Sequence, residues 1–300
     1  MEMKDFASRV CDSVRAELGI GYRVEMKEVR KNNSVVLHGL MILAQGRNVA
    51  PTIYLEGFLE AYEAGMPYEA ILRKILDAYR NNVPAEGVDM DFFRFFDKVR
   101  DRICYRLIGK RENEELLEEI PYIDFLDLAI CFYYAYQDDD LGHGSILIYN
   151  SHMEMWDTCT AELFGLAKRN TPKLFPWRCY SLDEVLAGAM DESTGQPVEE
   201  SLPELPLKVL SNINQVHGAG CILYPGVLEE LARKEGSGFY IIPSSIHEVM
   251  LLPAADTRMS ADELKQMIMD VNSTQVAPEE VLSDTLYFYD ARQEQVRQIF

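Results

Sequence analysis

The chain has 300 residues, 48% apolar and 26% charged, so it is long enough for one large core or two ordinary ones and is not typical of a disordered protein. It carries 49 Asp and Glu residues against 29 Lys and Arg, a formal net charge of −20. Because such a charge repels a phosphate backbone, we expect no nucleic-acid partner.

The cysteines and the N-terminus indicate a compartment. The six cysteines are scattered without a C-x-x-C pair, and most lie among apolar neighbours, as is typical of a reducing environment. The N-terminus lacks the basic-then-apolar pattern of a signal peptide, and no run approaches the roughly 18 uncharged apolar residues of a membrane span. We therefore expect a cytoplasmic protein with no membrane partner.

The first part of the chain predicts helices around a hairpin. Apolar residues at three- and four-residue spacing, alternating strand patterns and turn residues give the following order: a helix over 3–18, a hairpin turning at Asn32-Asn33, and helices over about 51–64 and 67–80.

A basic strand comes next. Ile103, Tyr105 and Leu107 alternate with Arg102, Cys104 and Arg106, which is the period of a strand. The pattern favours a solvated basic face bridged to the Glu-rich helix that follows at 112–119. The alternative is an anion site.

The middle of the chain predicts an antiparallel pair and a boundary. Residues 126–136 and 145–149 have strand patterns, and the acidic loop between them lacks the alternating oxygen ligands of a calcium loop. Residues 190–206 are acidic, contain three prolines and have almost no apolar period, so they predict a linker or a surface loop. We expect an N-terminal α+β region over 1–189 and a C-terminal α+β module over 207–300, which pack as two domains or as one.

The C-terminal module predicts a mixed sheet with flanking helices. Its expected elements, in order, are a strand at Cys221–Leu223, a helix from Tyr224, strands at 239–242 and 246–252 joined across Pro243-Ser244-Ser245, a helix capped by Ser260, and a strand at 286–289. The fold class expected for the whole chain is α+β.

Three stretches resemble a known family: Cys221-Ile-Leu-Tyr-Pro-Gly-Val-Leu-Glu-Glu-Leu, Ile242-Pro-Ser-Ser-Ile-His-Glu-Val-Met-Leu and Val271-Asn-Ser-Thr-Gln-Val-Ala-Pro-Glu-Glu-Val-Leu-Ser-Asp284. Ile146–Asn150, Trp156 and Asn170-Thr171-Pro172 fit the same resemblance. The family is an uncharacterised one from gut Firmicutes, known only as a domain of unknown function. The resemblance implies a compact cytosolic α+β protein and brings no activity, cofactor or site residue with it.

Candidate catalytic residues cluster at 244–248. Ser244 or Ser245 as nucleophile, His247 as base and Glu248 as orienting group would make a hydrolase. In a strand, however, Ser245 and His247 lie roughly 7 Å apart and Glu248 points to the opposite face, which favours a structural role. No histidine, cysteine or carboxylate grouping has metal spacing, and the glycine pairs lack the third glycine of a dinucleotide loop, so no metal or cofactor is expected.

A second set of candidates lies in the polar connection after the Ser260 helix. Its residues are either binding groups on an ordered loop or caps and turns; they are Asn272, Thr274, Gln275, Glu279 and Asp284.

Since each common catalytic or cofactor motif fails, the sequence favours a non-enzymatic binding or accessory protein that acts through protein partners. The alternatives are the 244–248 hydrolase and a small-ligand sensor, whose ligand lies between the C-terminal sheet and the 272–284 loop.

Overall fold

The computed structural model describes residues 1–47, 50–83, 91–138, 142–182 and 206–300. The chain divides into two compact units. The N-terminal unit comprises Met1–Phe92 with Gln137–His143, and the C-terminal unit comprises Phe93–Tyr136 with Gly144–Phe300.

The N-terminal unit is a three-stranded antiparallel sheet packed against helices. Its elements are α1 (Met3–Leu18), β1 (Tyr22–Arg30), β2 (Val36–Ala44), β3 (Thr52–Tyr54), α2 (Glu56–Glu63) and α3 (Tyr68–Asn82), and the strand order is β1-β2-β3. The α1 residues Phe6, Val10 and Val14, which recur every three or four positions, are fully buried in one core with Leu40 and Ile42 of β2. The helix, the hairpin and the helix over 67–80 are thus confirmed.

The helix expected over 51–64 is wrong in its first turn. Thr52–Tyr54 forms β3 and pairs with Gly39–Met41 of β2, and the helix begins only at Glu56. The β-branched Thr52 and Ile53 fit the exposed edge of the hairpin, so pairing with that edge overrides the helical spacing of this short segment.

The C-terminal unit contains two antiparallel sheets. The first has the order β4-β6-β5, with β7 also paired to β6, and the second has the order β13-β12-β10-β11-β9-β8. The strands are β4 (Ile103–Gly109), β5 (Tyr122–Phe125), β6 (Leu128–Asp138), β7 (Gly142–Leu147), β8 (Trp177–Ser181), β9 (Lys208–Asn212), β10 (Phe239–Ser245), β11 (Glu248–Pro253), β12 (Tyr287–Asp290) and β13 (Gln295–Gln298). Helices and antiparallel sheets together confirm the α+β class.

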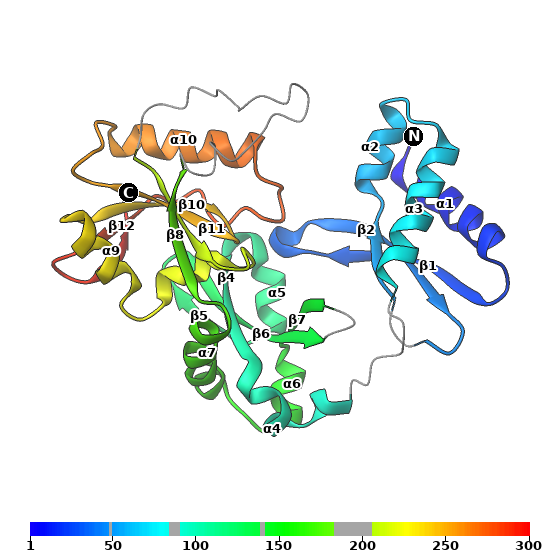
Figure 1. The fold of residues 1–300 in the computed structure, drawn as a ribbon, viewed down its shortest axis with the longest axis horizontal. Coiled ribbons are helices and arrows are strands. Elements are labelled where there is room, and N and C mark those ends of the chain that lie inside the picture. The colour runs from blue at the N-terminus through cyan, green and yellow to red at the C-terminus, as the bar shows by residue number, and fades with distance from the viewer. Residues whose placement is uncertain (48–49, 84–90, 139–141, 183–205) are drawn as a thin grey trace. The chain divides into compact units, whose positions relative to one another are not determined.

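Helices cover both sheets of this unit (Figure 1). They are α4 (Phe96–Val99), α5 (Glu114–Glu119), α6 (Asn150–Trp156), α7 (Thr160–Leu174), α9 (Val227–Glu235) and α10 (Ala261–Thr274). Helix α10 lies along the six-stranded sheet, where its Leu264 and Ile268 pack against Ile242 and Leu252. The capping box at Ser260 is formed as the sequence predicts, since the Ser260 Oγ accepts from the Glu263 amide.

The expected boundary at 190–206 lies outside the described residues, apart from Pro206. The strands on either side of it, β8 and β9, pair antiparallel from Trp177 opposite Asn212 to Ser181 opposite Lys208. The chain therefore returns after this segment to the sheet from which it left. Asp139 and Asp140 of the acidic loop also lie outside the described residues.

Two local predictions in the C-terminal module are wrong. Residues 221–223 belong to a 3-10 helix, η5 (Gly218–Leu223), because a run of three apolar residues fits a buried turn as well as a strand. The turn between β10 and β11 falls at Ile246-His247 and not at residues 243–245. The register shifts between Ile242 and Ser245, an irregularity that accommodates Pro243, which has no amide hydrogen for the ladder.

The Asp127 carboxylate joins the two sheets of this unit. It lies between β5 and β6 and accepts hydrogen bonds from the hydroxyls of Ser283, Thr285 and Tyr287, at 2.7, 2.8 and 2.8 Å, on and next to β12. Burial acts to raise the pKa of Asp127, but these three hydrogen bonds outweigh it and hold the pKa below its usual range. The ionised carboxylate is therefore the form that the fold stabilises.

We predict that Asp127→Ala lowers the free energy of unfolding by about 2 kcal/mol, or the Tm by roughly 4–8 °C, because hydroxyls lose a charged acceptor. Since the folded pKa is depressed, the difference from the wild type is present at neutral pH and shrinks in acid as the carboxylate becomes protonated. Thermal unfolding followed by circular dichroism measures both effects. Asp124→Asn is the control, because Asp124 makes only an exposed ion pair with Lys110. Equal losses in the two variants would contradict this role.

Candidate functional site

The η5 segment packs closely against the β10–β11 turn. A Cβ atom at Gly218 would lie 2.1 Å from the Ser211 Oγ and 2.4 Å from the His247 carbonyl oxygen, so only glycine fits there. The Ser211 hydroxyl donates to the same His247 carbonyl at 2.7 Å. The turn, β9 and η5 are thereby held together around His247.

His247 is fixed by main-chain and side-chain contacts. The His217 amide donates to the His247 Nδ1 at 3.2 Å, which makes Nδ1 the acceptor and assigns the proton of the neutral ring to Nε2. The Nε2 lies 3.6 Å from the Glu280 Oε1, and the two imidazole rings of His217 and His247 stack at 5.8 Å between centroids. Glu280 belongs to the 272–284 loop. Its main-chain carbonyl also accepts a hydrogen bond from the Ile246 amide at 2.8 Å.

The serines predicted as nucleophiles are placed differently from a catalytic pair. The Ser245 hydroxyl accepts from the His247 main-chain amide at 3.0 Å, and the imidazole is engaged through His217 and Glu280. Ser244 is half-buried at the β-bulge. Glu248 is half-buried, and burial raises its pKa, with His247 acting in the opposite direction. These contacts stabilise the turn, and among the described residues none joins a serine hydroxyl to the imidazole.

Arg106, in the middle of β4, has an unusual environment. Its Nε is fully enclosed and has no hydrogen-bond partner among the described residues. Burial lowers the pKa of Arg106, and the groups that act in the opposite direction are the Cys131 thiol and the Tyr133 and Tyr149 hydroxyls, with no carboxylate among them. The expectation of a fully solvated basic face is wrong for Arg106, because the residue is half-buried, its Nε is enclosed and the six other residues of β4 are all buried.

His217 lies close to Arg106. Burial lowers the pKa of His217 to about 3, and the neighbouring Arg106 and His247 act in the same direction to a smaller extent, so the His217 ring is neutral at pH 7. Its Nδ1 is enclosed and, like the Arg106 Nε, finds no partner in the part of the chain that the structure describes. The ring contacts Tyr133 in a T-shaped arrangement, at 5.1 Å between centroids. Arg106, His217 and His247 together form what we call the Arg–His cluster.

The candidates after the Ser260 helix divide into caps and exposed groups. Asn272 is buried and donates to the Ser283 carbonyl and the Asp284 carboxylate, at 3.0 and 2.8 Å. Thr274 and Gln275 are exposed, and the Thr274 hydroxyl donates to the Asp270 carbonyl. Glu279 is half-buried. Asn272 and Asp284 thus fix the loop, and the loop carboxylate that approaches the Arg–His cluster is that of Glu280.

Sequence reasoning missed Arg106, His217 and Glu280 as members of one site. His217 lies far from the other histidines in the sequence. The Gly-Ala-Gly run that follows it could have indicated that another segment of backbone packs closely there. Arg106 could have been found because apolar residues flank it on both sides within one strand.

The site shows no sign of a metal centre. No group of three or more His, Cys, Asp or Glu residues with the arrangement to hold a metal ion occurs within the described ranges. All six cysteines are free. None of the helices that the structure describes is both long and apolar enough to cross a membrane.

The chain matches the Family of unknown function (DUF5688) over residues 3–291. It therefore belongs to this family, as the resemblance in the sequence implied. No curated protein and no solved structure matches the chain.

We predict that His217 makes the protein less stable as the pH falls. Its folded pKa lies below the ordinary value of about 6.5, so the unfolded state binds the proton first and stability is lost as the pH falls from 6.5 towards 3. Between pH 7.5 and 5.0 the wild type should lose about 1–2 kcal/mol more than His217→Phe, which keeps a ring against Tyr133 and takes up no proton.

Urea unfolding of both proteins at the two pH values measures the difference. The other titrating groups are common to both proteins. The relevant quantity is therefore how the difference in the free energy of unfolding between the two proteins changes with pH. Parallel losses in the two proteins would contradict a neutral His217 with an enclosed Nδ1.

Proposed function

We propose that this protein is a non-enzymatic binding protein whose C-terminal unit takes a small anion, or the anionic end of a small molecule, at the Arg–His cluster. The observation that carries the proposal is Arg106, a half-buried residue whose enclosed Nε has no hydrogen-bond partner within the described chain. A buried charge without a partner is costly, and such groups concentrate at functional sites. Carboxylate and phosphate groups match the geometry of a guanidinium, because two of their oxygens can accept a pair of parallel hydrogen bonds from it.

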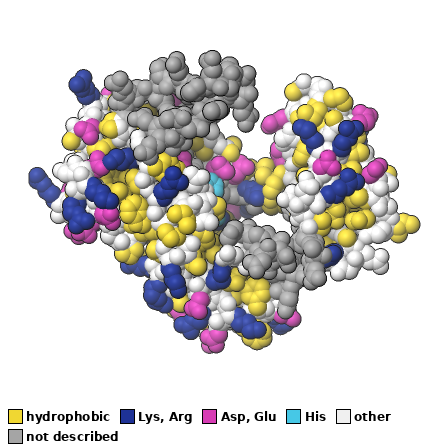
Figure 2. All heavy atoms as spheres, viewed as in Figure 1, with side chains coloured by type: hydrophobic (Ala, Val, Ile, Leu, Met, Phe, Trp, Pro, Cys, Tyr) yellow, Lys and Arg dark blue, Asp and Glu magenta, His cyan; other side chains and the backbone are white. Residues whose placement is uncertain are grey.

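Arg106 and His217 support an anion over a cation, since the Glu280 carboxylate approaches His247 and no carboxylate acts on Arg106. The Nε of Arg106 is enclosed, but the residue as a whole is only half-buried, so part of it is accessible to an incoming ligand. His217 offers a neutral ring with an enclosed, unpaired nitrogen, which can donate one hydrogen bond. The visible surface has no comparable basic site, since acidic and basic side chains are interspersed on the face seen in Figure 2. Arg106, whose Nε has no partner among the described residues, is therefore a local feature of a chain with net charge −20 and not part of a basic surface.

This proposal refines the small-ligand alternative and leaves the hydrolase with less support. The Ser245 hydroxyl and the His247 imidazole are each engaged by main-chain amides. A serine labelled by a fluorophosphonate probe at position 244 or 245 would restore the hydrolase. We also propose a cytoplasmic location, because free cysteines are typical of a reducing compartment.

The test is thermal unfolding in inorganic phosphate or acetate at constant ionic strength. At a tenfold excess over the Kd, one of these anions should stabilise the wild type by about 1.4 kcal/mol, or roughly 3–6 °C in Tm. Arg106→Met, which replaces the charge by an apolar side chain of similar length, should abolish this shift. It should not lower the Tm without anion, because no partner in the described chain is left unpaired by the change.

Arg102→Met is the matched control. The Arg102 Nε donates to the Ala135 carbonyl at 2.7 Å, so this variant should lose stability yet keep the response to the anion. A wild type that responds to neither anion, or an Arg106→Met variant that responds as the wild type does, would overturn the proposal.

Protein contacts are the second candidate, favoured by the exposed loop that leads to His217. Its Ile213 and Val216 side chains are 58% and 44% exposed. If this loop contacts a partner protein, that protein should cross-link to residues 213–216 of the wild type. The double variant Ile213→Ser/Val216→Ser should no longer cross-link to it, while its thermal response to the anion stays unchanged. A partner retained by the double variant would exclude this surface.

A further inference from the structure

A pocket of about 410 Å³ lies in the C-terminal unit, away from the residues of the Arg–His cluster. It is formed by η5, the start of α9, β12 and β13, together with Phe125 of β5. This volume is within the range of about 300–1,000 Å³ typical of sites for small molecules. Its lining residues include no lysine, arginine or histidine.

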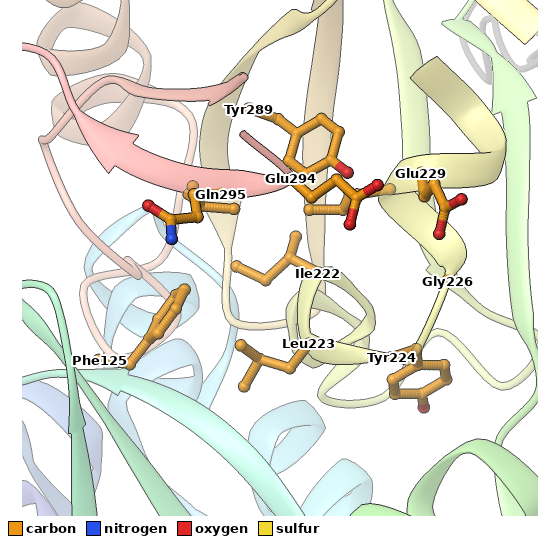
Figure 3. A pocket seen from close by; sticks show the side chains of 11 residues that line it. Phe125, Ile222, Leu223, Tyr224, Gly226, Glu229, Tyr289, Glu294 and Gln295 are labelled. Carbon is orange, nitrogen blue, oxygen red and sulfur yellow. The ribbon is translucent and has the colours of Figure 1, made fainter. Parts of the chain in front are cut away.

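The floor of the pocket is apolar and one side is acidic. Figure 3 shows Ile222 and Leu223 beneath the carboxylates of Glu229 and Glu294, which lie on the same side as the Tyr289 hydroxyl. Both glutamates are exposed, and neither has a hydrogen bond or an ion pair to another described residue. Two uncompensated carboxylates beside one pocket attract a positive charge and repel a negative one.

Tyr289 provides an independent sign of a ligand. Its side chain is only 4% exposed and stacks on Phe239 at 5.2 Å between centroids. Its hydroxyl has no hydrogen-bond partner in the described part of the chain, and it points towards the two carboxylates. Burial raises the pKa of Tyr289, with Glu294 and Glu229 adding to the shift, so the hydroxyl stays protonated and can accept from an N–H group.

We infer that this pocket binds a small organic cation, a primary amine with an apolar body. The ammonium group lies between Glu229, Glu294 and the Tyr289 hydroxyl, and the apolar body covers Ile222 and Leu223. The ring of Phe125 at the opposite side adds an aromatic contact. This site is separate from the proposed anion site, so each can fail without the other.

The test uses three probes of the same shape in isothermal titration calorimetry at low salt. Tyramine carries the ammonium group, 4-ethylphenol lacks it, and 3-(4-hydroxyphenyl)propionate replaces it by a carboxylate. Tyramine should bind with a Kd on the order of 1 mM, as its few atoms allow. The neutral phenol should bind at least about tenfold more weakly and the anion weakest of all, and added NaCl should weaken tyramine alone.

Variants identify the groups responsible. Glu229→Gln combined with Glu294→Gln should weaken tyramine by at least about tenfold, because both charges are exposed and each contributes a few-fold. Glu230→Gln is the matched control, since Glu230 pairs with Lys234 and does not line the pocket. Tyr289→Phe keeps the stacked ring and should weaken tyramine a few-fold, and Arg106→Met should leave it unchanged.

Equal affinities for tyramine and 4-ethylphenol, an unchanged Kd in the double glutamine variant, or no binding of tyramine at 10 mM (about ten times the expected Kd) would each overturn the inference. A lysine-containing peptide that binds more than tenfold tighter than tyramine would also overturn it, since the cation would then come from a protein side chain.

Discussion

The C-terminal unit depends on the polar junction between its two sheets. Asp127 accepts from three hydroxyls on the chain that leads into and along β12, more than 150 positions away in the sequence. The Tyr105 hydroxyl of β4 donates to the Gly220 carbonyl of η5 at 3.3 Å. Because these groups are buried or half-buried, their hydrogen bonds can form only when both sheets are in place, so they specify the relative position of the sheets as well as stabilise it.

The Arg–His cluster follows from the same packing. Once Gly218 allows η5 to approach Ser211 and the β10–β11 turn, His217 must lie between Tyr133 of one sheet and His247 of the other. The His217 Nδ1 and the neighbouring Arg106 Nε are both enclosed there. A fold stabilised by apolar cores and by Asp127 can tolerate an enclosed Arg106 Nε that has no partner among the described residues, whereas an unstable fold could not. The destabilisation caused by the Arg106 Nε is therefore confined to a place where a bound ligand could accept its hydrogen bond.

Local patterns of the sequence predicted the regular elements well. Apolar spacing in α1 and the capping box at Ser260 depend on neighbours within one or two turns, and both are found where expected. The turn at Ile246-His247 was misplaced because a β-bulge at Pro243 shifts the register, and a bulge depends on the partner strand. The 3-10 helix η5 was read as a strand because three apolar residues carry no period that distinguishes the two.

The site could be predicted only in part, for the same reason. The sequence singled out His247, Asn272 and Asp284, which have contacts within about a dozen positions and so leave a local signal. Arg106 approaches His217, and Glu280 approaches His247, through contacts between distant segments, which no spacing rule predicts. Arg106 was predicted to lie on the surface because arginines are mostly exposed, and its neighbour His217 lies more than a hundred residues further along the chain.

The most direct test of the account is the NMR signal of the Arg106 Nε–H group, assigned as the arginine signal that is lost in Arg106→Met. An enclosed, unpaired Nε–H should exchange slowly with water in the anion-free protein and should shift saturably when inorganic phosphate or acetate is added. A signal that exchanges as fast as those of exposed arginines, or that does not move with either anion, would contradict an unpaired arginine held for a ligand.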